Sequence, residues 1–102
     1  MDPYILSTIS EENRFNIVEY LLNGAHPVNE ISYKLHLSQP KTSKHLKILA
    51  DAGVVDVKKN KQQRIYSLAP EKFEEMDAWI SQFKKLWNKR LDRLDRILKE
   101  VK

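Results

Sequence analysis

The sequence has no cysteine, only two glycines and no long apolar run in its 102 residues. The lack of cysteine excludes disulfides, thiolate nucleophiles and sulfur-ligated zinc sites. Two isolated glycines, Gly24 and Gly53, do not form a glycine loop that binds nucleotide phosphates. No apolar run approaches the roughly 18 residues of a membrane-spanning helix, and the N-terminus lacks the pattern of a signal peptide. We therefore expect one cytoplasmic domain over residues 1–102 that binds no membrane.

The positive charge of the chain is concentrated in its middle third. The net charge is +4, but residues 38–67 carry seven lysines and arginines against two aspartates. Residues 1–23, by contrast, carry four acids against one base. A basic segment of this kind is typical of a surface that binds nucleic acid, although a solvated surface gives the same count.

Apolar residues repeat every three or four positions in the first quarter of the chain, which predicts helices. A short helix is expected around Ile5–Ile9. The next helix is expected to be capped by Ser10, because serine is a good N-cap and two glutamates follow it. Asn23-Gly24 ends that helix, and Val28 is expected in one short strand after it.

The middle of the chain predicts two more short helices. The first covers residues 30–35. The second covers about residues 39–52, because Ser38 is a suitable N-cap, Pro40 is tolerated in the first turn and Gly53 stops the helix. A turn of only a few residues separates the two helices, which is the spacing of a helix-turn-helix.

After Gly53 the apolar residues alternate with polar ones, first at residues 55–58 and again at residues 65–68. This period of two predicts a hairpin with the polar run Lys58–Gln63 at its tip. The fold class is therefore mainly α with a small β hairpin, a winged helix-turn-helix. We assign residues 10–69 to the winged-helix core and residues 70–102 to a long C-terminal helix that Pro70 opens and that runs to about Val101.

The helix predicted at residues 39–52 has a basic outer face. If Leu46 lies at the centre of its buried face, Thr42 turns toward the core, whereas Lys41 and Lys44 lie opposite and His45 lies on the flank. Lysines at a helix N-terminus oppose the helix dipole at a cost of only tenths of a kcal/mol. A phosphate backbone at this end would turn that cost into a gain, because the helix amides and the lysines would all face anions.

A specific run of residues on this helix resembles a known family. The run LSQPKTSKHLKILADAGVV at positions 37–55, together with RFNIV at 14–18 and RIYSL at 64–68, is similar to the ArsR-type winged-helix repressors. The resemblance implies a homodimeric bacterial repressor that binds an inverted repeat in double-stranded DNA. Carried over by position, the DNA-reading residues are Ser38, Gln39, Lys41, Thr42, Ser43, Lys44 and His45. Gln39 suits adenine, and Lys44 suits guanine or a phosphate.

The hairpin supplies the second part of the expected DNA surface. Its basic residues Lys58, Lys59, Lys61 and Arg64 are expected on the DNA backbone or in the minor groove. The family has a glycine at the hairpin tip, whereas this chain has Asn60-Lys61 there. We expect Asn60 to take the positive φ that a tight turn needs.

Metal and enzyme sites are not indicated within one chain. Metal-sensing members of the family use cysteine pairs or sets of aspartate, histidine and glutamate on the last helix, but residues 70–102 contain no histidine. We therefore expect no metal, no cofactor and no enzymatic activity, and we expect Asp92 to pair with Arg96 at the surface. Two alternatives stay open. One is a zinc- or nickel-responsive repressor with a site between two chains, and the other is a winged-helix adaptor that binds a protein.

The C-terminal helix carries an apolar seam that a core of this size does not cover. A helix of 31 residues is roughly 46 Å long, and its apolar residues follow a spacing of three and four that resembles a coiled coil. The first part, from Phe73 to about Ile80, is expected to pack on the chain's own core. The remainder predicts a homodimer interface, formed by Phe83, Trp87, Leu91, Leu94 and Leu98, with the N-terminal helices alongside.

Overall fold

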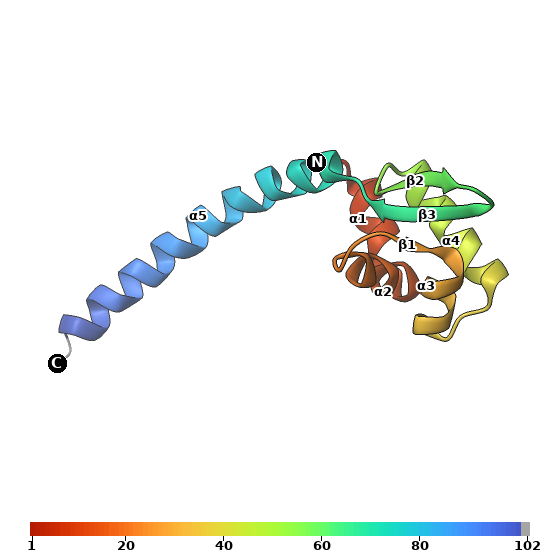
Figure 1. The fold of residues 1–102 in the computed structure, drawn as a ribbon. Helices are drawn as coiled ribbons and strands as arrows, with labels where there is room; N and C mark the ends of the chain where they lie inside the picture. Colours follow the sequence, from red (N-terminus) through yellow and green to blue (C-terminus); the bar gives the residue numbers. More distant parts are fainter. Residues whose placement is uncertain (101–102) are drawn as a thin grey trace.

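The computed structural model describes residues 1–100, which form a helical body with a small sheet and one projecting helix (Figure 1). The helices are α1 (Pro3–Ser10), α2 (Glu12–Leu21), α3 (Val28–Leu35), α4 (Gln39–Asp51) and α5 (Pro70–Glu100), and the strands are β1 (His26–Pro27), β2 (Val55–Asn60) and β3 (Gln63–Leu68). The predicted fold class, a mainly helical winged helix-turn-helix with a long C-terminal helix, is confirmed. Val101, where the last helix was expected to end, lies outside the described residues.

The sheet has three antiparallel strands in the order β1-β3-β2. In the hairpin, Val55 pairs with Leu68 at one end and Asn60 pairs with Gln63 at the other. The third strand is β1, in which His26 pairs with Tyr66 and Pro27 pairs with Ile65. The expected strand at Val28 is therefore wrong by one residue, because Val28 is already the first residue of α3. Pro27 is placed at an edge, where its missing N–H costs no ladder hydrogen bond.

The core lies where α1–α4 meet the sheet. Its fully buried side chains include Ile17, Ile31, Leu46, Leu49 and Val54. Tyr66 of β3 is also buried, and Phe73 and Met76 of α5 cover the edge of the core. The apolar face of α4 thus packs between the other helices and the sheet. The opposite face of α4 is exposed.

The junction of α1 and α2 differs from the sequence prediction. Ser10 is the last residue of α1 and does not cap α2. The cap is Glu11, whose backbone is extended and whose carboxylate Oε2 accepts a hydrogen bond from the Arg14 N–H at 2.9 Å. The prediction of Ser10 as N-cap is wrong because α1 runs one residue further than expected, so that the chain bends at Glu11.

Helix α5 leaves the body after its first turns (Figure 1). None of its described residues is buried, and the described chain extends over 64 × 25 × 21 Å. Among the helices of residues 1–100, none combines the length and the apolar character that are needed to cross a membrane.

Candidate nucleic-acid interface

The start of α4 is fixed by the turn that joins it to α3. Helix α3 ends at His36, whose backbone is left-handed (φ 56°, ψ 40°). Ser38 then caps α4, with its Oγ accepting a hydrogen bond from the Lys41 N–H at 3.3 Å. The Thr42 hydroxyl donates to the Ser38 carbonyl at 2.9 Å. The first turn of α4 is therefore held at both its side-chain and its backbone groups.

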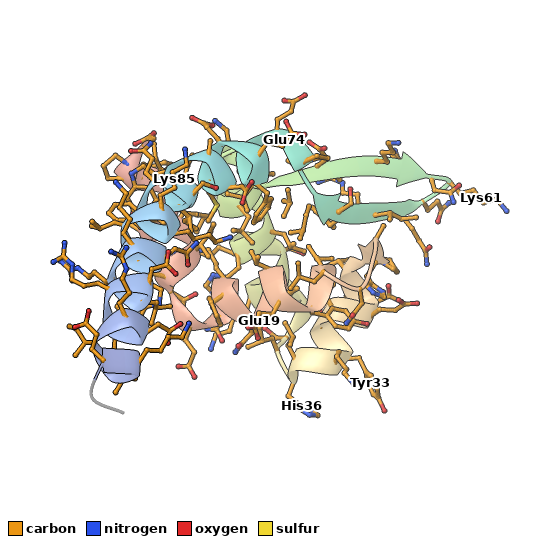
Figure 2. All side chains as sticks on the ribbon, turned by 90° about the vertical axis from the view of Figure 1, so that its left-hand side faces the viewer. Glu19, Tyr33, His36, Lys61, Glu74 and Lys85 are labelled. Carbon is orange, nitrogen blue, oxygen red and sulfur yellow. The ribbon has the colours of Figure 1, made fainter. Side chains whose placement is uncertain are left out.

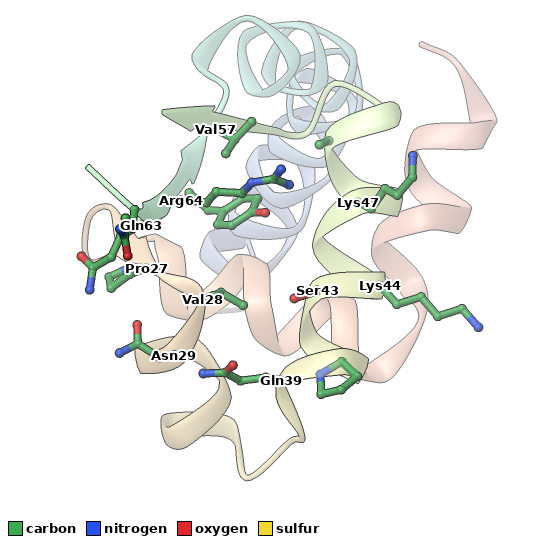
Figure 3. Close-up of a pocket in the computed structure, with 14 residues that line it drawn as sticks. Pro27, Val28, Asn29, Gln39, Ser43, Lys44, Lys47, Val57, Gln63 and Arg64 are labelled. Carbon is green, nitrogen blue, oxygen red and sulfur yellow. The ribbon is translucent and has the colours of Figure 1, made fainter. Parts of the chain in front are cut away.

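A groove of about 870 Å³ lies between α4, the start of α3 and the hairpin. We call it the α4–wing groove, with the hairpin β2–β3 as the wing. Figure 3 shows Arg64 of β3 reaching across the groove toward α4, and Lys44 projecting outward from α4. Its polar and charged lining consists of Asn29, Gln39, Ser43, Lys44, Lys47, Gln62, Gln63, Arg64 and the hydroxyl-bearing Tyr66.

Five of these lining residues were not predicted from the sequence as site residues, namely Asn29, Lys47, Gln62, Gln63 and Tyr66. Lys47 lies three positions after Lys44 and thus on the same face of α4, which is a signal the sequence contained. Asn29 and Gln63 come from α3 and β3, and their position in the groove follows from tertiary packing that no local pattern shows.

The basic residues of the wing lie at its outer end. Lys58, Lys59, Lys61 and Arg64 are all exposed, and Figure 2 shows Lys61 at the tip, pointing away from the body. The residue with positive φ at the tip is Lys61 (φ 58°), so the prediction that Asn60 takes this conformation is wrong. Asn60 is the last paired residue of β2, and the turn proper begins one residue later.

Two of the predicted DNA-reading residues face the protein interior. Thr42 is completely buried, as its position on the core face of the helix predicts. Its side chain therefore cannot contact DNA, and the prediction of Thr42 as a DNA-reading residue is wrong. His45 has a side chain that is only 16% exposed, and its Nδ1 lies 3.3 Å from Nη1 of Arg14. The expectation of an exposed His45 is wrong because α4 packs against the α1–α2 junction on that flank.

The remaining predicted residues are all exposed, and the structure brings Gln39, Ser43, Lys44 and Arg64 together in the groove. On α4 and at its N-cap, the exposed residues are Ser38, Gln39, Lys41, Ser43 and Lys44. Of the lysines and arginines of α4 and the wing, Lys47 alone is paired with a carboxylate in the part of the chain that is described, through a 3.3 Å contact with Asp51. This surface therefore presents several uncompensated positive charges around a groove.

The apolar seam of α5 is exposed along its length. Trp87 is 60% exposed and Leu98 is 55% exposed, and Phe83, Leu91 and Leu94 are exposed to a similar degree. Phe73 and Met76 pack on the core as predicted, but the predicted packing does not reach Ile80, which is 38% exposed. A hollow of about 410 Å³ opens beside Phe83, Leu86 and Trp87. Nothing within residues 1–100 covers the distal half of this helix.

No set of three histidine, aspartate or glutamate side chains in residues 1–100 is placed to hold a metal ion. The expected Asp92–Arg96 pair is not among the ion pairs that these residues form, so that prediction is wrong. Both side chains are exposed, and an ion pair in water gains little free energy.

Comparison with known proteins identifies similar chains. The family described as "Bacterial regulatory protein, arsR family" matches residues 11–57. A biofilm growth-associated repressor of Agrobacterium fabrum is 34% identical over 68 residues, which cover 67% of this chain and 58% of that protein. The transcriptional activator HlyU of Vibrio cholerae is 33% identical over 72 residues, which cover 71% of this chain and 67% of that protein.

Solved structures agree with the fold. HlyU from Vibrio cholerae superposes with a TM-score of 0.67 at 30% identity, over 78% of this chain and 87% of that chain. A homodimeric winged helix-turn-helix DNA-binding domain from Mycobacterium bovis superposes with a TM-score of 0.68 at 18% identity, over 81% of this chain and 77% of that chain, and shows the fold alone. The matched part of this chain spans about three fifths of the length of the first curated relatives.

Proposed function

The chain belongs to the ArsR family of bacterial regulatory proteins, and on this premise we propose that it is a dimeric, sequence-specific DNA-binding repressor of transcription. The family and the relatives reported above are transcription regulators and not enzymes. The observation that carries the proposal is the α4–wing groove, because a basic concave surface beside the N-terminus of an exposed helix fits a DNA backbone and a base edge together.

In the proposed complex, the first two turns of α4 enter the major groove. Gln39 reads adenine and Lys44 contacts guanine or a phosphate, because these side chains match the donor and acceptor patterns of those base edges. Lys41 binds a phosphate at the N-terminal end of α4, where the helix dipole favours an anion. The wing places Lys58, Lys59, Lys61 and Arg64 on the neighbouring backbone or in the minor groove.

The proposed partner is a second copy of the chain. The exposed seam of Phe83, Trp87, Leu91, Leu94 and Leu98 is an amphipathic helix face that nothing among residues 1–100 covers. Tyr4 and Leu6 of α1 and Phe15 of α2 add further exposed apolar surface. The Mycobacterium bovis structure is described as homodimeric, which supports this assembly for the fold. Two-fold symmetry then matches an inverted-repeat operator.

Binding is tested by selecting DNA from a random pool and titrating the recovered duplex at several salt concentrations. Specific binding is expected, with affinity that falls steeply as salt rises because several phosphates are neutralised. Gln39→Ala and Lys44→Ala are expected to weaken binding by about tenfold each, in line with about 1–3 kcal/mol for a good base contact. Both variants should keep the circular dichroism spectrum of the wild type.

Lys85→Ala is the matched control, because Lys85 lies on α5 at the side of the molecule away from Lys61 (Figure 2). Equal affinity for selected and scrambled duplexes would contradict the proposed function. Wild-type affinity in both groove variants would show that α4 is not the reading helix. The direction of regulation is tested by transcription in vitro from a template that carries the selected site, where added protein is expected to lower the transcript level.

A further inference from the structure

A polar cluster joins α4 to the junction between α1 and α2. His45 Nδ1 lies 3.3 Å from Arg14 Nη1 and 3.7 Å from Glu11 Oε2. Arg14 Nε donates a hydrogen bond to the Thr8 carbonyl oxygen, near the end of α1, at 2.6 Å. The side chains of Arg14 and His45 are each only 16% exposed. One guanidinium group therefore links three helices, and one of them is the proposed reading helix.

The chemistry of this contact assigns the state of the histidine ring. A guanidinium group has only N–H donors, so the His45 Nδ1 accepts the hydrogen bond and the ring carries its proton on Nε2. The charged groups that face the ring are Arg14 and Glu11 of the α1–α2 junction. With a neutral ring, the Arg14 guanidinium contacts the Glu11 carboxylate, the Thr8 carbonyl and the His45 imidazole at the same time.

We propose that Arg14 and His45 are positioning residues that set the orientation of α4 for DNA reading, and that His45 acts through Arg14 without touching a base. This inference rests on the DNA-binding function proposed above. The apolar contacts of α4 allow small rotations, whereas a planar guanidinium that contacts both Thr8 of α1 and His45 of α4 restricts the orientation of α4. His45 directly follows Lys44, so a rotation at the cluster displaces the reading face. Because Arg14 also holds α1, the cluster connects the proposed dimer surface to the reading helix.

Four variants test the inference on the selected duplex. Arg14→Lys keeps the charge but replaces the planar fork of N–H donors with a single flexible ammonium group, and His45→Ala removes the acceptor. Both are expected to weaken binding about tenfold, as the loss of a hydrogen bond to a charged group predicts. His45→Asn places an amide oxygen near the position of Nδ1 and is expected to restore affinity to within about threefold of the wild type. His36→Asn is the matched control, because His36 is exposed and its left-handed backbone suits asparagine.

A positioning role and a direct contact give different patterns. Positioning lowers affinity by the same factor for every single-base variant of the duplex and leaves the salt slope unchanged. Relaxed preference at one base pair in His45→Ala would show a base contact and overturn the inference, and so would wild-type affinity in His45→Ala and Arg14→Lys. If His45→Ala does not fold, Arg14→Lys and His45→Asn decide by the same criteria. Failure of the wild type to bind specific DNA would instead overturn the proposed function.

Discussion

Lys61 occupies a backbone conformation that disfavours a side chain. Its φ of 58° at the wing tip costs an L-residue roughly 1–2 kcal/mol relative to the right-handed region, and glycine is the residue that avoids this cost. A lysine in such a place is consistent with selection for its charge rather than for the stability of the turn. The wing tip is therefore a position where stability and DNA affinity can be separated experimentally.

We predict that Lys61→Gly and Lys61→Ala weaken DNA binding equally. Each removes one proposed phosphate contact per subunit, so the slope of log affinity against log salt should become shallower by about two for a dimer. The unfolding free energy should change by less than about 1 kcal/mol in either variant, because the relief of strain in the glycine variant is offset by the greater freedom of its unfolded chain. Salt titrations and urea unfolding measure the two quantities, and an unchanged slope would remove Lys61 from the DNA surface.

Glu11 predicts a pH-dependent contribution to stability. Partial burial acts to raise the pKa of Glu11, but hydrogen bonds from the Arg14 and Asn13 N–H groups, the charge of Arg14 and, when its ring is protonated, the charge of His45 outweigh it, so the pKa lies below its ordinary value of 4.5. A lowered pKa in the folded state means that the ionised carboxylate stabilises the fold. This contribution is fully present above about pH 4.5 and is lost as the pH falls through the folded-state value.

Glu11→Gln is therefore expected to lower the unfolding free energy by roughly 0.5–1 kcal/mol at pH 7, the size of a charge effect at a helix N-terminus. The difference from the wild type should shrink as the pH falls below 4.5. Urea unfolding at a fixed protein concentration gives the values, with Glu19→Gln, an exposed residue of the same helix, as control. A difference that stays constant as the pH falls well below 4.5 would contradict the role of ionisation at this cap.

At the scale of the element, α5 is the helix with the least support from its own chain. Trp87 is 60% exposed, although tryptophan is among the residues that contribute most at protein interfaces. We predict that Trp87→Ala and Leu91→Ala each weaken the dimer at least about thirtyfold, since an interface residue of this kind contributes about 2 kcal/mol. Sedimentation at micromolar concentration measures the effect, with Lys85→Ala as a control on the same helix. A Trp87→Ala protein that stays dimeric under dilution would place the interface elsewhere.

The elements themselves were largely predictable from the sequence, because their signals are local. Ser38, Pro40 and Gly53 mark the two ends of α4, and the alternation of apolar residues marks the wing. The failures occur where two elements compete for the same residues. Ser10 has a hydroxyl that suits an N-cap, but it is the last residue of the preceding helix, α1. Asn60 suits a positive φ, but strand pairing holds it and moves the turn to Lys61.

The sequence predicted which surface of α4 would be exposed for DNA binding. It predicted less well which side chains on that surface are covered by other parts of the chain. The helical wheel separated Lys41 and Lys44 from the buried face, as the structure shows. It did not show that the flank at His45 is covered, because the covering groups, Arg14 and Glu11, lie more than 30 positions earlier in the chain. Residues that line the α4–wing groove from α3 and β3, such as Asn29, depend on the same long-range packing.

At the scale of the whole molecule, the proposed DNA surface and the proposed dimer seam lie at different ends. Figure 1 shows α5 leaving the body on the side away from the tip of the wing. A dimer that is joined along α5 therefore leaves both α4–wing grooves open. The two reading helices of such a dimer are held at a fixed separation, which for this class of motif is about one turn of DNA, roughly 34 Å.

This geometry predicts how binding depends on the spacing of the two half-sites in the selected operator. An insertion of five base pairs between the half-sites rotates one of them to the opposite face of the duplex, and an insertion of ten returns it to the same face but moves it about another 34 Å away. A rigid dimer reaches the second half-site in neither case. Both insertions are therefore expected to reduce affinity to that of a duplex with a single half-site. Electrophoretic mobility shifts with the three duplexes measure this, and the single half-site duplex serves as the reference. Subunits that bind independently would tolerate both insertions, and a dimer with a flexible connection would recover affinity with the insertion of ten base pairs.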